Sequence, residues 1–135
     1  MTIKALQPPG WAAPKGYANG VAATVLDKGT HIFVAGQIGW NGQCQFESDD
    51  LVAQVRQALA NIVAVLAEAG AQPVHIVRMT WYLTDKREYL KRAREIGAAY
   101  RELIGSYTVA MSAVQVTALM EDRALVEIEV TAVVP

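Results

Sequence analysis

The chain has 135 residues, enough for one domain with a hydrophobic core, and we expect residues 1–135 to form that single domain. Apolar residues make up 53% of the sequence and charged residues only 19%, which favours a second buried surface, most simply a subunit interface, over a tightly packed monomer rich in Ala and Val. The formal net charge is -1 without a basic tract, so the composition argues against a nucleic-acid-binding protein.

Targeting and metal-binding signals are sparse. The first residues contain no apolar stretch like that of a signal peptide, and no run approaches the roughly 18 apolar residues of a membrane span. We therefore expect a cytoplasmic protein with no membrane partner. The one cysteine, Cys44, lies in a polar loop distant in sequence from His31 and His75, so we interpret it as a bystander thiol and expect no metal site.

Hydrophobic periodicity and turn residues predict seven elements in the order ββαβαββ. The D-K-G sequence at 27–29 indicates a hairpin between the first two strands. Ser48, Asp49 or Asp50 can cap the start of the first helix, and Asp85 with Glu88 resembles a capping box for the second. The predicted strands are 17–26, 31–38, 76–83, 111–117 and 125–134, and the predicted helices are 51–69 and 86–104.

The last predicted strand has two unlike faces. One face carries Val126, Ile128, Val130, Ala132 and Val134, and the other carries Glu127, Glu129, Thr131 and Val133. Two helices can cover only one face of a sheet. The apolar face suits packing under the helices, so the mixed face is predicted to meet water or a partner, and its composition suits a subunit interface with polar groups in its clefts.

Four strings resemble segments of a known family. The segment 109–134 reads V-A-M-S-A-V-Q-V-T-A-L-M-E-D-R-A-L-V-E-I-E-V-T-A-V-V, which resembles the pattern P-A-R-S-x-V-x-V-x-x-L-P followed by a strand like V-E-I-E-A. That pattern is typical of the Rid family of reactive intermediate deaminases, also called YjgF proteins. G-Y-A-N-G-V at 16–21, F-V-A-G-Q-I at 33–38 and V-R-M-T-W-Y-L-T-D at 77–85 resemble further family segments in the same order.

The resemblance implies an α+β fold with a mixed sheet, two helices on one face, and a homotrimer like that of the small trimeric chorismate mutases, with a cleft at each subunit boundary. It also implies hydrolysis of small enamines and imines, such as 2-aminoacrylate, to a keto acid and ammonia without a cofactor or metal. For this chemistry the protein must bind the substrate, position a water molecule and transfer protons to and from the reacting atoms.

The resemblance also implies roles for individual residues. Glu127 matches the last-strand carboxylate that places or activates water, although it has the alternative role of a solvated or interface glutamate. Tyr17 matches the tyrosine of the cleft, or packs as an ordinary strand aromatic. Gly36 matches the point where backbone approaches the ligand, or marks a bulge, and Gln37 beside it offers a polar contact.

Met111 departs from the pattern, because it stands where the family has its substrate-binding arginine. A thioether cannot anchor a carboxylate through paired hydrogen bonds. Either Arg123 or Arg78 supplies the charge from another position, or the substrate carries no carboxylate there and Met111 lines an apolar pocket with Trp40 and Tyr17. We favour the second alternative.

The sequence thus predicts a hydrolytic deaminase of enamine or imine intermediates with an altered substrate preference, and weak or absent turnover of 2-aminoacrylate. The alternative is a non-catalytic trimer that binds a small metabolite in the same clefts, and the methionine at position 111 supports it. A chaperone-like or ribonuclease-like role, as suggested for some relatives, is a third hypothesis, and the lack of a basic patch argues against a nuclease.

Overall fold

The computed structural model describes residues 2–6, 9–10, 13, 20–24, 29–105 and 108–135. Its main sheet has four strands in the order β3-β6-β4-β5, with bounds β3 Thr30–Ile38, β6 Val126–Val134, β4 Ile76–Leu83 and β5 Ala110–Gln115. Strand β6 is antiparallel to both of its neighbours, whereas β4 and β5 are parallel. This mixed sheet confirms the predicted α+β class.

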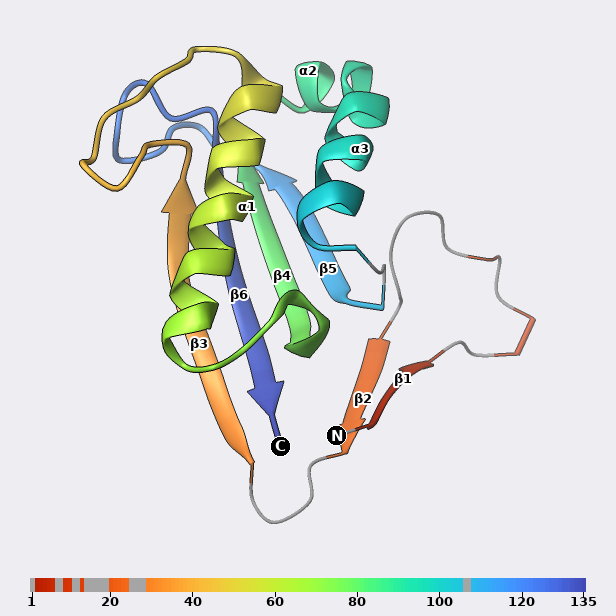
Figure 1. Cartoon of the computed structure of the whole chain (residues 1–135). Coiled ribbons are helices and arrows are strands. Elements are labelled where there is room, and N and C mark those ends of the chain that lie inside the picture. The colour runs from red at the N-terminus through yellow and green to blue at the C-terminus, as the bar shows by residue number, and fades with distance from the viewer. Residues whose placement is uncertain (1, 7–8, 11–12, 14–19, 25–28, 106–107) are drawn as a thin grey trace.

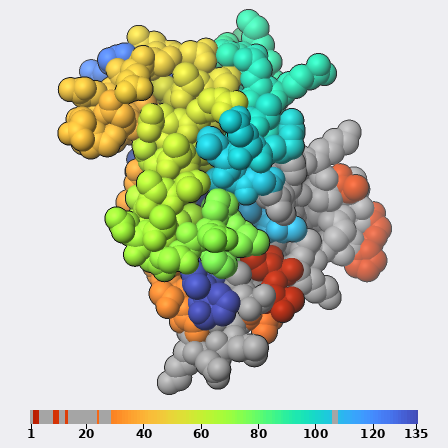
Figure 2. Space-filling view, in the orientation of Figure 1, coloured from red at the N-terminus to blue at the C-terminus, as the bar shows by residue number. Residues whose placement is uncertain are grey.

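The helices lie together on one face of the sheet (Figure 1). They are α1 Leu51–Glu68, α2 Lys86–Lys91 and α3 Ala93–Leu103, and a short 3-10 turn, η1 Pro73–His75, precedes β4. Figure 2 shows this covered side, with α1 in yellow to green beside α3 in cyan. The opposite face of the sheet carries none of the described helices.

The N-terminal part differs from the prediction. Strand β2 Gly20–Thr24 lies within the predicted range 17–26, but it pairs with β1 Thr2–Leu6 in a separate two-stranded antiparallel sheet. Among the described residues no ladder joins β2 to β3, so the predicted hairpin is not found there, and Asp27 and Lys28 of its D-K-G turn lie outside the described residues. A turn sequence specifies a local reversal of the chain and does not choose the ladder partner of the strand that follows.

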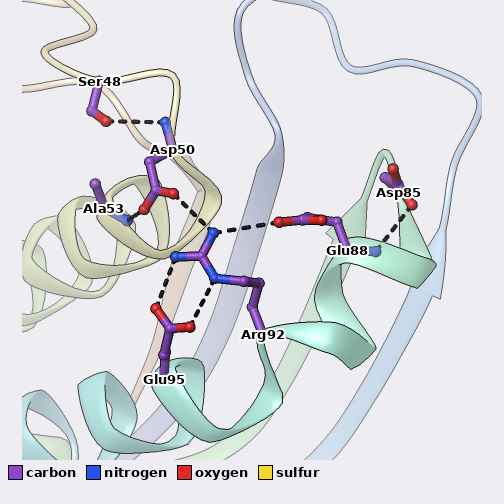
Figure 3. Close-up of polar contacts among 7 residues, drawn as sticks. All are labelled: Ser48, Asp50, Ala53, Asp85, Glu88, Arg92 and Glu95. Carbon is purple, nitrogen blue, oxygen red and sulfur yellow. Dashed lines mark hydrogen bonds and ion pairs between the residues drawn. The ribbon is translucent and has the colours of Figure 1, made fainter.

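The second predicted helix is divided at Arg92, which ends α2 and begins α3 with φ -97° and ψ 14°. Its guanidinium hydrogen-bonds Asp50, Glu88 and Glu95, so the break is stabilised by ion pairs to both helices and to the start of α1 (Figure 3). Two of the predicted caps are confirmed, because Asp50 accepts from the Ala53 amide and Asp85 accepts from two amides at the start of α2. The Glu88 side chain accepts from Arg92, so the Glu88 half of the predicted capping box stays a prediction.

The core lies between α1, α3 and the covered face of the sheet. On β6 the predicted alternation is confirmed from Val126 to Ala132, with Val126, Ile128, Val130 and Ala132 at most 3% exposed. It ends there, because Val133, predicted for the open face, is 5% exposed and Val134 is only partly buried. By length and composition α1 also passes a criterion for a membrane span, but it has eight buried residues, as a core helix of a soluble domain does. The buried side chains of α1 are Leu51, Val52, Gln54, Val55, Ala58, Leu59, Ile62 and Leu66.

Candidate functional site

Glu127 and Gly36 meet on adjacent strands at an irregular point of the sheet. Strand β3 pairs Val34 with Val130 and then Gln37 with Ile128, so one extra residue of β3 is accommodated in a β-bulge that contains Gly36. A Cβ atom at Gly36 would lie 2.5 Å from Oε1 of Glu127. The absent side chain of this glycine therefore leaves the space that the Glu127 carboxylate occupies, and the alternative interpretation of Gly36 as a bulge residue is confirmed.

The Glu127 carboxylate borders a cavity of about 280 Å³ at this point. The cavity is lined by Gly36, Gln37, Ile38, Trp40, Met120, Glu121 and Glu127. Four of the seven predicted site residues, namely Gly36, Gln37, Trp40 and Glu127, thus come together around one space. The volume suits a small metabolite rather than a large cofactor.

Trp40 is fixed from two sides. Asn61 on α1 donates through Nδ2 to the carbonyl oxygens of Ile38 at 3.1 Å and of Trp40 at 2.8 Å, which holds the backbone where β3 ends. Phe46 lies against the indole with a centroid separation of 5.9 Å, and the same two residues form an isolated antiparallel bridge. The aromatic part of the cavity wall is therefore positioned before any ligand arrives.

Gln54 connects the loops around the site. It is 1% exposed, and its Nε2 donates to the carbonyl oxygens of Ser48 and Arg123 while its Oε1 accepts from the Leu125 amide. Gly39 lies against it, because an added Cβ would come within 2.7 Å of the Gln54 Cα. One buried amide thus joins the loop after β3 to the loop before β6.

Arg123 lies outside this cavity lining. Its guanidinium pairs with Asp49, with Nη2 at 2.9 Å and Nε at 3.0 Å from Oδ1, and it stacks 5.4 Å from the centroid of Phe46. Arg78 lies on the uncovered face, where it lines a separate hollow of about 130 Å³ with Glu129 and Thr80. Neither arginine reaches the Glu127 cavity within the described chain, and a substrate contact by Arg123 stays a prediction.

Met111 lies on the other face of the sheet from Glu127. In the parallel pair of β4 and β5, Met111 is opposite the buried Met79, and its side chain packs against the core. Glu127 is opposite Tyr82, whose side chain is on the uncovered face. A role for Met111 in substrate binding stays a prediction, and so does a role for Tyr17, which lies outside the described residues.

A second carboxylate on the uncovered face has a partner. The Tyr82 hydroxyl donates to Oε1 of Glu129 at 2.7 Å, and this hydrogen bond raises the pKa of Tyr82. In contrast, the Glu127 carboxylate makes no hydrogen bond or ion pair with any residue in the part of the chain that the structure describes. Among the described residues, the Glu127 carboxylate is therefore free to bind a ligand, whereas the Glu129 carboxylate already has a hydrogen-bond donor.

Sequence reasoning missed three residues of the lining, which are Ile38 at the end of β3 and Met120 and Glu121 on the loop between β5 and β6. Met120 is 97% exposed at the rim of the cavity. A signal was present, because Met120 falls on the last proline of the pattern P-A-R-S-x-V-x-V-x-x-L-P. Among the residues described, no group of three His, Cys, Asp or Glu side chains is arranged to hold a metal ion.

Comparison with known proteins assigns the family. A family model described as Endoribonuclease L-PSP matches residues 12–134. A RutC family protein of Pyrococcus abyssi is 33% identical over 114 residues, or 84% of this chain and 86% of that protein. A 2-iminobutanoate/2-iminopropanoate deaminase of Salmonella typhimurium is 30% identical over 108 residues, or 80% of this chain and 81% of that enzyme.

A solved structure agrees with the sequence relatives. The crystal structure of YyfB from Yersinia pestis, a Rid family protein of unknown function, matches with a TM-score of 0.81 and 32% identity, over 99% of this chain and 100% of that one. The family predicted from the four sequence strings is confirmed, and the chain belongs to the Rid family, also called the YjgF family.

Proposed function

We propose that this protein is a hydrolytic deaminase of small enamine or imine intermediates and that it works without a cofactor. The observation that carries the proposal is the Glu127 carboxylate, which lacks a hydrogen-bonding partner among the described residues and borders a cavity at a glycine bulge. A carboxylate in this position can accept a proton from a water molecule held in the same space. The Salmonella relative, named as an imine deaminase, supports the reaction class.

The reaction needs few groups. An enamine first tautomerises to the imine, and protonation gives the iminium ion. The oxygen of water bonds to the iminium carbon while Glu127 takes a proton from that water. Glu127 then returns the proton to nitrogen. As the C–N bond breaks, Glu127 takes the hydroxyl proton and passes it to the departing ammonia, so a carbonyl compound and ammonium are released. One water is consumed for each bond broken, and no redox partner is required.

The substrate preference is proposed to differ from that of relatives with the arginine. Met111 offers no charge, and losing a bidentate charged contact typically costs about 1.5–3 kcal/mol of binding. Imines that lack a carboxylate at that position avoid the loss. We therefore propose weak turnover of 2-aminoacrylate and better turnover of carboxylate-free imines.

A ligand that contacts both Met111 and Glu127 requires more than one copy of the chain, because the two residues lie on opposite faces of one sheet. We propose that the copies are joined through the uncovered face in a homotrimer. Phe33 is 76% exposed on this face and Val114 is also exposed, so apolar surface is available for burial. Sedimentation velocity measures this directly, and a monomer at micromolar concentration would contradict it.

Ammonia release from imines generated in place by oxidases tests the proposed activity. We expect Glu127→Gln to lower the rate on the preferred imine by about 100-fold or more, because the amide cannot take the proton of water. Glu129→Gln is the matched control, since it changes a carboxylate on the same face that hydrogen-bonds Tyr82 instead of the cavity. Equal rates for Glu127→Gln and wild type would contradict the assignment of Glu127.

The same assay decides between the deaminase and a non-catalytic metabolite-binding trimer, which the missing arginine favours. We expect Met111→Arg to gain activity on imines that carry a carboxylate. Activity of the arginine variant alone would mean that Glu127 is competent and that the natural ligand lacks the carboxylate. If neither protein accelerates hydrolysis of any imine in the panel, the binding protein replaces the deaminase.

A further inference from the structure

The charged residues in the described lining of the Glu127 cavity are all negative. Two of its lining residues, Glu121 and Glu127, carry carboxylates, and the other lining groups are an amide, an indole, two apolar side chains and a glycine. Among the residues that the structure describes, the lining contains no Lys, Arg or His. An anionic ligand entering this space would therefore add a third negative charge, and no cation of the described lining would offset it.

The two nearby arginines, Arg123 and Arg78, do not bring a positive charge into the cavity lining. Arg123 follows Glu121 by two positions, but it holds Asp49 through two nitrogens and covers the Phe46 ring. A guanidinium that already has a carboxylate partner gains little by leaving it for a ligand. Arg78 borders a different hollow on the uncovered face.

The apolar part of the lining suits a positively charged nitrogen with a hydrocarbon body. Indole is the most favourable aromatic side chain for binding a cation, and Trp40 is held by Asn61 and Phe46. Ile38 and the exposed Met120 offer apolar contact next to the carboxylates. An ammonium or iminium N–H can donate to Glu127 while its alkyl group rests against these side chains.

We propose that the Glu127 cavity binds the cationic nitrogen of a carboxylate-free compound, which is the iminium ion of an amine or the parent amine itself. This deepens the proposed function, since it names the substrate class of the same site and rests on that function for the hydrolysis step. Binding of the cation is a separate property, which can be measured without turnover. In an active enzyme the class of reaction that supplies the substrate would be the oxidation of a primary amine.

Three ligands with one carbon skeleton test the binding: isoamylamine carries only the cation, leucine carries cation and carboxylate, and 4-methylpentanoate carries only the carboxylate. Isothermal titration calorimetry of the full chain at pH 7 is the measurement. We expect isoamylamine to bind at least about tenfold more tightly than leucine, a difference of about 1.4 kcal/mol, and no detectable binding of 4-methylpentanoate. Tighter binding of leucine or 4-methylpentanoate than of isoamylamine, or no binding of isoamylamine, would overturn the proposal.

Substitutions of single glutamates test whether isoamylamine binds in the Glu127 cavity. We expect Glu127→Gln to weaken isoamylamine binding by about tenfold or more, Glu121→Gln to weaken it less because that residue is exposed, and Glu129→Gln to leave it unchanged. An equal loss in Glu127→Gln and Glu129→Gln would show that only the overall charge matters, which would overturn the site. The comparison of the three ligands on wild type needs no variant, so it decides the ligand class even if a variant fails to fold.

Turnover separates this inference from the proposed function. Ammonia release is followed from the imine that an amine oxidase makes from isoamylamine and from the imine that an amino-acid oxidase makes from leucine. Acceleration of the leucine-derived imine alone would keep the deaminase and overturn the cationic, carboxylate-free class. Tight isoamylamine binding without acceleration of either imine would keep the ligand class and remove the deaminase.

Discussion

The two faces of β6 show how one strand specifies both a core and a candidate site. On the covered face, Val126, Ile128, Val130 and Ala132 are at most 3% exposed and pack under the helices. On the other face, Glu127 borders a cavity and Glu129 accepts a hydrogen bond from Tyr82. The covered face is specified by the need to fill space with apolar atoms, whereas each charged group of the open face is specified by its own polar surroundings.

This difference predicts which face governs stability. Ile128 is fully buried, so Ile128→Ala removes apolar contacts and leaves a void, and we expect the free energy of unfolding to fall by about 2–5 kcal/mol. Urea unfolding followed by circular dichroism measures it. The matched change on the open face, Glu129→Ala, removes one exposed hydrogen bond and is expected to cost much less. If Glu129→Ala lowered the free energy of unfolding as much as Ile128→Ala, the covered face would not govern stability.

The covered face is also the part that sequence predicts well. A period of two on β6 and a helical period on α1 follow from the burial of one side of each element, so pattern alone places Val126, Ile128 and Leu59 in the core. The partner of β2 was not predictable in the same way. Strand pairing is decided by contacts between distant segments, and the D-K-G turn gave no indication that β2 pairs with β1.

Gln54 is a polar residue that is buried, so it belongs neither to the apolar core nor to the open face. Gln54 satisfies two carbonyls and one amide of the loops that flank the cavity. Gln54→Leu has a similar volume but leaves those three backbone groups without partners, so we expect a loss of about 2–4 kcal/mol in unfolding free energy. Gln57→Leu is the control on the same helix, because within the described residues the Gln57 side chain bonds only to the Asn61 side chain. A smaller loss of unfolding free energy in Gln54→Leu than in Gln57→Leu would show that water replaces the hydrogen bonds of Gln54.

Two nearby glycines sharpen the comparison, because one faces the core and the other faces the cavity. At Gly39 an added Cβ would meet the Cα of Gln54 at 2.7 Å, and this backbone atom cannot move easily. At Gly36 the nearest atoms belong to the Glu127 side chain, which can rotate away. We expect Gly39→Ala to cost about 1–3 kcal/mol of stability, and Gly36→Ala to cost less stability while abolishing activity or amine binding.

Thermal unfolding and calorimetry on the two variants separate these effects. Gly42→Ala serves as the control, since nothing lies within 4 Å of its added Cβ. If Gly36→Ala binds isoamylamine as wild type does, the Glu127 carboxylate is not needed in the position that the glycine allows.

The candidate site was predictable only in part, and for a physical reason. Gly36, Gln37 and Glu127 came from the family pattern and Trp40 from the expected apolar pocket, and the four meet at one cavity. Met120 and Glu121 lie on an irregular loop, where no periodicity relates a residue to a face. The placement of Met111 on the opposite face depends on the register of β4 with β5, which the sequence does not specify.

The smallest expected effect concerns Arg92, which joins the start of α1 to the break between α2 and α3 (Figure 3). Its hydrogen bonds lower the pKa of Asp50 and of Glu95 from their ordinary values of 3.8 and 4.5. A carboxylate whose pKa is lower in the folded state adds stability above its unfolded pKa and loses it as the pH falls through the folded pKa.

Arg92→Gln is therefore expected to be less stable than wild type at pH 7, and the difference should narrow as the pH falls below about 4.5 toward the lowered values. Urea unfolding of both proteins at pH 7 and pH 3 measures this change. Arg56→Gln is the control, because Arg56 makes one exposed ion pair among the described residues, with Glu102, and its removal should matter less at pH 7. A difference for Arg92→Gln that stays constant between the two pH values would mean that packing of the Arg92 side chain, rather than its charge, holds the helices at the break.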